Sequence, residues 1–184
     1  MADIINVRTS FLQRLIGAAA LDVGVYEEIE ADESATSQAF LTVVLSSVAA
    51  GIGARGLGGD PVTSFVFVTV VSLIAWAAWA LVTFEIGVHV LPGRKTRANV
   101  GELLRTIGFA SAPGFLRLLG VLRGGTTPAF VISSVWMLAA MVVAVRQSLD
   151  YDSTPRAIGV CVLGWVLAIA VALGLGVTFG PALY

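Results

Sequence analysis

Four long stretches of this chain contain no Lys, Arg, Asp, Glu or His: residues 34–54, 61–84, 124–145 and 157–184. A helix needs about 20 apolar residues to cross the roughly 30 Å hydrocarbon layer of a bilayer. Each stretch is long enough. The pattern therefore predicts an all-α integral membrane protein in which lipid surrounds most of the chain.

Three of the predicted spans begin with one local signal, a polar side chain followed by proline. The pairs are Asp60-Pro61, Thr127-Pro128 and Thr154-Pro155. The polar residue can cap a helix, and proline fits the first turn, where no backbone N–H is needed. With the first charge-free stretch, these signals predict spans at about 38–55, 61–91, 128–147 and 155–180.

A further span is predicted at residues 103–122, although this segment contains Arg105, Arg117 and a central Pro113-Gly114. Proline removes a helical hydrogen bond and clashes with the preceding turn, so we expect a kink or break. The freed carbonyl groups need partners in lipid, which predicts that other helices surround the element. A kinked span and a re-entrant hairpin are both compatible with the sequence, and we favour the span.

Residues 1–37 are predicted to precede a five-helix transmembrane domain at 38–184. Within them, the pattern of residues 4–21 predicts an amphipathic helix with an apolar stripe along one face. Arg8 and Arg14 are expected to lie outside this stripe. This helix could lie in the membrane interface or pack on the protein itself. The acidic stretch that follows is expected to be a solvated connector, or a docking surface for a basic partner. The stripe residues are Ile4, Val7, Phe11, Leu15 and Ala18, and the acidic residues are Glu27, Glu28, Glu30, Asp32 and Glu33.

The distribution of basic residues predicts the orientation. Five spans with a cytoplasmic N-terminus place eight basic residues inside and three outside, as the positive-inside rule requires. The C-terminus is then outside. The inside residues are Arg8, Arg14, Arg94, Lys95, Arg97, Arg105, Arg146 and Arg156, and the outside residues are Arg55, Arg117 and Arg123.

Composition excludes several classes of function. Charged residues make up 12 % of the chain, about half the share in soluble domains, and the net charge of −1 argues against nucleic acid as a partner. One Cys (Cys161) and one His exclude cysteine-based and paired-histidine metal sites. No catalytic motif is present, so we predict no enzyme activity, no metal and no cofactor. The four tryptophans lie mostly within spans and are expected to be packing residues.

Glu85 and His89 are the ionisable pair within a predicted span. They lie four residues apart, on one face of a helix. A carboxylate in hydrocarbon needs a partner, and the candidates are His89, Arg94 and Arg105. One reading is a proton- or cation-binding site on a transport path that includes Arg105. The other is a structural ion pair at the membrane surface.

The loop with Arg94, Lys95 and Arg97 is expected to set topology and to contact anionic lipid head groups. Small residues at four-residue spacing predict faces for close helix contact, within the bundle or with another copy. The predicted packing residues, including those at the break, are Ser47, Gly51, Pro113, Gly114, Ala168, Ala172 and Gly176.

Three segments resemble the bacterial branch of the Yip1 domain family of polytopic membrane proteins. They are residues 26–53 (YEEIEADESATSQAFLTVVLSSVAAGIG), 102–119 (ELLRTIGFASAPGFLRLL) and 135–165, which begins with Val135-Trp136. The resemblance implies five spans and a cytoplasmic N-terminus. It transfers no functional residues.

We therefore expect an inner-membrane protein of bacterial type, with the lipid bilayer and further membrane subunits or a second copy as partners. The first hypothesis is a non-enzymatic scaffold or accessory subunit that acts through helix and lipid contacts. The second is a small proton- or ion-coupled transporter or channel that uses Glu85 and His89. A membrane-bound enzyme is the least favoured class, and the sequence identifies no small-molecule ligand.

Overall fold

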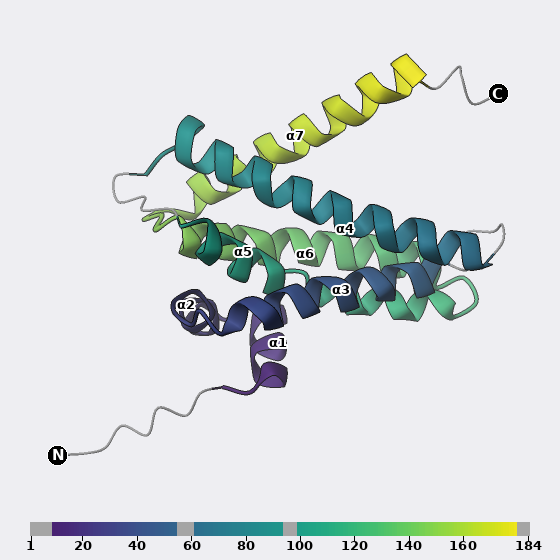
Figure 1. Cartoon of the computed structure of the whole chain (residues 1–184), viewed down its shortest axis with the longest axis horizontal. Coiled ribbons are helices and arrows are strands. Elements are labelled where there is room, and N and C mark those ends of the chain that lie inside the picture. Colours follow the sequence, from purple (N-terminus) through teal and green to yellow (C-terminus); the bar gives the residue numbers. More distant parts are fainter. Residues whose placement is uncertain (1–8, 55–60, 94–98, 180–184) are drawn as a thin grey trace.

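The computed structural model describes residues 9–54, 61–93 and 99–179, with backbone alone for residues 61, 64 and 168–179. All the regular elements in these ranges are helical. Two short helices come first, and the longer helices follow them (Figure 1). In chain order the elements are α1 (Phe11–Ala19), α2 (Val23–Ala31), α3 (Ala35–Gly53), α4 (Pro61–Glu85), η2 (Ile86–Val90), α5 (Val100–Phe109), η3 (Ala112–Val121), α6 (Thr126–Ser148) and α7 (Thr154–Phe179).

The long elements alternate in direction between two ends of a bundle (Figure 1). Helix α3 leaves the end where α2 lies, α4 returns to it, α5 with η3 leaves again, and α6 returns. Helix α7 starts at the α2 end and diverges from the bundle toward the C-terminus. Helix α3 packs on η3, α4 and α5, and α6 packs on η3, α5 and α7.

Three described helices are long and apolar enough to cross a membrane: Ala35–Gly53, Phe65–Val90 and Thr126–Ser148. They correspond to the first, second and fourth predicted spans. The described side chains of α7 form a shorter apolar segment, Thr154–Leu167. The fold is therefore a helical bundle of membrane type, while crossings by α7 and by the 103–122 segment remain predictions.

The prolines mark the helix starts correctly: α4 begins at Pro61, and Pro128 lies in the first turn of α6. The residue predicted to cap α6 does not do so. Helix α6 begins at Thr126 with Pro128 in its first turn, but its N-cap residue is Gly125, without a side-chain cap. The prediction that Thr127 caps this helix was therefore wrong. Instead, the Thr126 hydroxyl donates to the Gly120 carbonyl at 2.8 Å and ties the helix start to η3.

The segment predicted at 103–122 consists of two helices of different type. Helix α5 is a regular α-helix that ends at Phe109, and η3 is a tighter 3₁₀ helix from Ala112 to Val121, with Pro113 in its first turn. At the junction of the two helices, the Ser111 hydroxyl donates to the Gly108 carbonyl at 2.6 Å, so this carbonyl has a hydrogen-bond partner. Residues 109–114 are all buried. The junction therefore lies between α3 and α6 and away from lipid.

The N-terminal region differs from its prediction in two respects. Arg14 lies on the buried face of α1 together with Ala18, and not off it. The acidic stretch is mostly helical and forms α2, whose Tyr26 and Ile29 are fully buried, so it is not a solvated connector. Helix α1 packs on α2, α5 and η3. Leu12 and Ile16 remain exposed, so an interfacial role for its other face is still a prediction.

Candidate functional site

Glu85 and His89 form the ion pair that their spacing predicts. His89 Nδ1 lies 3.0 Å from Glu85 Oε2, and the two side chains are 65 % and 67 % exposed respectively. His89 carries its charge only when protonated. The pair is on the outer surface of the bundle, at the end where α4 gives way to η2. The two side chains therefore face outward from the bundle and do not line an internal path.

The chain around His89 is a π-helical turn, η2. Such turns leave carbonyl groups poorly paired and occur often at functional sites. The Tyr151 hydroxyl lies 3.0 Å from the Gly87 carbonyl oxygen and 2.7 Å from that of Leu91. One hydroxyl hydrogen can serve one of these acceptors at a time. Tyr151, from the turn between α6 and α7, thus holds η2 in place.

Arg105 does not join the Glu85–His89 pair. Its side chain is buried, and Nη2 donates to the main-chain carbonyl of Glu30, 2.5 Å away, at the C-terminal end of α2. A cation at this position also complements the negative end of the helix dipole. The structure therefore separates Arg105 from the predicted site and assigns it to the attachment of α2.

Glu30 belongs to the acidic stretch, and the fold adds the negative charges of Asp150 and Glu102, which the sequence alone did not connect with it. Burial and the negative charges of Asp150, Glu102 and Glu27 all disfavour its charged form, and Arg105 offsets only part of this. The pKa of Glu30 rises from near 4.5 to about 7. A raised carboxyl pKa stabilises the fold fully below pH 4.5, and that contribution is lost as the pH rises through about 7.

Arg14 is the centre of a second network that the sequence analysis missed. Its guanidinium donates to Glu28 (Nη2–Oε1, 2.8 Å), to Asp32 (Nη2–Oδ2, 2.6 Å) and to Gln38 (Nη1–Oε1, 3.1 Å). Burial opposes the charge of Arg14, but the two carboxylates outweigh it and raise its pKa. Hydrogen bonds from Ser34 and Arg14 lower the pKa of Asp32 to about 2. This network joins α1, α2 and the start of α3.

The predicted packing residues of α3 are used within the bundle. Ser47 and Gly51 are buried, and a Cβ at Gly51 would overlap Thr69 Oγ1 and the Phe65 carbonyl of α4. A Cβ at Gly114 would overlap Ser46 Oγ, so η3 approaches α3 closely beside the buried Pro113. Arg94, Lys95 and Arg97, and the side chains of Ala168, Ala172 and Gly176, are outside the described residues.

No group of three or more His, Cys, Asp or Glu side chains in the described ranges could hold a metal ion. Cys161 is buried, as its apolar surroundings in the sequence predict. Comparisons with protein-family models, with curated proteins and with solved structures found no match to this chain.

Proposed function

We propose that this chain is a Yip1-like integral membrane protein of the bacterial inner membrane, with five crossings, a cytoplasmic N-terminus and an external C-terminus. In this proposal it is not an enzyme. It acts as a scaffold or accessory subunit through helix–helix and lipid contacts.

The observation that carries the proposal is the exposure of α4. In the most apolar part of Phe65–Val90, 6 % of the positions are buried, compared with 50 % in Ala35–Gly53 and 33 % in Thr126–Ser148. Large apolar side chains cover its outer surface, among them Val66, Phe67 and Ile74. A helix with so few positions buried by its own bundle has most of its surface free for lipid or for a partner helix.

The close packing of small residues in α3 and η3 agrees with this proposal. Gly51 and Gly114 are already packed within the bundle, so they are not available to a partner. Among the described surfaces, we propose α4 as the one through which a second membrane protein binds. An ion-coupled transporter is less well supported, because Glu85 and His89 face outward and Arg105 bonds elsewhere.

Photo-cross-linking in intact membranes tests the proposal. A photoreactive phenylalanine analogue at Phe67 on α4 should form a discrete adduct with a membrane protein, either a second copy or another chain. Val135 on α6 is a matched control because both side chains are 66 % exposed. If Phe67 forms adducts with lipid alone, and mild detergent yields a monomer without stoichiometric companions, the scaffold role is wrong.

A further inference from the structure

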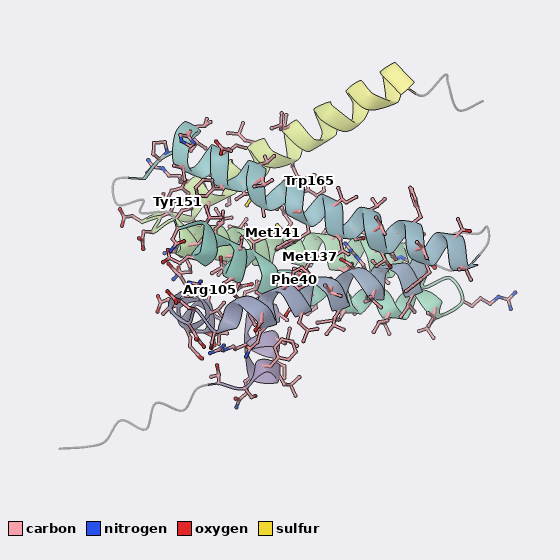
Figure 2. The ribbon with its side chains drawn as sticks, in the orientation of Figure 1. Phe40, Arg105, Met137, Met141, Tyr151 and Trp165 are labelled. Carbon is pink, nitrogen blue, oxygen red and sulfur yellow. The ribbon has the colours of Figure 1, made fainter. Side chains whose placement is uncertain are left out.

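A cavity of about 300 Å³ lies between α4, η3, α6 and α7. Its lining includes Trp76 and Trp79 of α4, Arg117 of η3, Ser134 and Met137 of α6, and Trp165 of α7. The labels of Met137, Met141 and Trp165 in Figure 2 mark this region of the bundle. Its volume is at the lower end of the range for small-molecule sites.

Arg117 is a cation without a carboxylate partner in the described part of the chain. Its Nε donates to Ser133 Oγ at 3.1 Å and its Nη2 to Ser134 Oγ at 3.3 Å. The guanidinium carbon lies 5.2 Å from the centre of the Phe130 ring, which adds a cation–π contact. A guanidinium has five N–H donors, so three remain after these two bonds. The serines therefore hold Arg117 in place and leave its charge uncompensated.

Two of the side chains that line the cavity, Trp76 and Trp79, carry further donors. The indole Nε1 atoms of Trp76 and Trp79 are buried and have no hydrogen-bond partner. An indole N–H can only donate, so each of them needs an acceptor. Of the two serines in the lining, Ser72 and Ser134, the Ser134 hydroxyl already accepts from Arg117. The cavity thus has an excess of donors and a positive charge, which is the complement of an anion.

The position of the cavity decides which anion can reach it. Ser134 lies eight residues after the start of α6, about 12 Å along a helix, which is most of one hydrocarbon leaflet. An unpaired cation at this depth is costly. Much of the lining is apolar, and its Val71 and Trp165 are exposed on the bundle surface. An anion that arrives through lipid needs an apolar tail.

We propose that this cavity binds the phosphate or carboxylate head group of an anionic lipid, which Arg117 pairs with and the two indoles hydrogen-bond. The tail lies along Val71 and Trp165. The proposal requires that the bundle lies in a bilayer, but it does not depend on the scaffold role.

Tryptophan fluorescence gives a direct test, because three of the four tryptophans line the cavity. The full-length protein is placed in phosphatidylcholine nanodiscs with a small fraction of brominated phosphatidic acid or, separately, of brominated phosphatidylcholine. Brominated phosphatidic acid should quench at about a tenfold lower mole fraction, equivalent to about 1.4 kcal/mol. Arg117→Gln should remove this preference. Arg123→Gln, which removes an exposed charge outside the cavity, should retain it.

Native mass spectrometry distinguishes the possible sources of the anion. Phosphatidic acid should stay bound to the parent protein when inorganic phosphate is added in excess. The Trp76→Phe/Trp79→Phe double variant keeps an aromatic side chain at each position but removes both N–H donors, so it should retain less lipid. It decides the question if Arg117→Gln does not fold. The proposal is overturned if the two brominated lipids quench equally, if folded Arg117→Gln keeps the preference, if inorganic phosphate displaces the lipid, or if the double variant retains as much lipid as the parent.

Discussion

Replacement of Arg14 by Met should release α1 and α2 from the bundle while the long helices stay folded. The Arg14 side chain is 2 % exposed, and those of its partners Glu28 and Asp32 are 32 % and 17 % exposed. Met keeps much of the apolar volume but leaves two carboxylates without their cation. The variant therefore tests whether this network fastens the N-terminal region.

The expected magnitude follows from the burial of the two partners. Removal of one member of a buried ion pair costs about 3–5 kcal/mol. Glu28 and Asp32 keep some contact with water, so we expect the lower end of that range. About 3 kcal/mol corresponds to a roughly hundredfold shift in the local opening equilibrium, since each 1.4 kcal/mol is a factor of ten.

Hydrogen–deuterium exchange of the α1 and α2 amides, followed by mass spectrometry in nanodiscs, measures this opening. Exchange in Arg14→Met should be about a hundredfold faster than in the parent, while α6 is unchanged. The matched control is Arg123→Met, at an exposed turn position. Additional replacement of Glu28 by Gln and Asp32 by Asn should recover part of the protection. Parent-like exchange in Arg14→Met would refute the reasoning.

Three further predictions concern stability in detergent, measured by thermal unfolding. The parent should lose stability as the pH rises from about 4.5 to about 7, because the folded state stabilises the protonated carboxyl of Glu30, and Glu30→Gln should not show this loss; an identical pH profile in both proteins would contradict this. Tyr151→Phe should lower the free energy of unfolding by about 1 kcal/mol, because the hydroxyl can no longer donate to the Gly87 carbonyl of η2 or to the Leu91 carbonyl just after it; no change would mean that the hydroxyl does not hold that turn. Gly51→Ala should cost about 1–3 kcal/mol, since its Cβ would overlap the α4 backbone. Gly159→Ala is the control, because its Cβ would lie 3.6 Å from Leu91 Cδ1, an ordinary contact. If the two glycine variants have the same free energy of unfolding, α3 and α4 do not pack closely enough at Gly51 to exclude a methyl group.

The parts of the fold that follow from short-range signals were predictable. A charge-free run bounded by proline determines where α4 and α6 begin, because lipid excludes other conformations for such segments. The Glu85–His89 pair also follows from local spacing. Its outward direction does not, because that depends on which face of α4 the other helices cover.

The networks that join distant segments could not be predicted in the same way. Residues 11, 14, 15 and 18 share one face of α1, so a charge at position 14 suggests a solvated edge unless its partners are known. Those partners, Glu28 and Asp32, come from the next helix. Arg105 bonds a carbonyl 75 residues earlier in the chain. A charged residue in an apolar pattern indicates that a partner exists, but the tertiary fold determines which one.

Labelling with a membrane-impermeant maleimide tests most directly whether this bundle crosses a bilayer. Cys161 is buried and is replaced by Ala, and single cysteines are then introduced at Arg123 and at Ser153, exposed positions at opposite ends of the bundle. In intact cells or right-side-out vesicles, the Arg123→Cys protein should be labelled, and the Ser153→Cys protein should react only after the membrane is opened. Labelling of both positions from the same side would contradict the transmembrane fold.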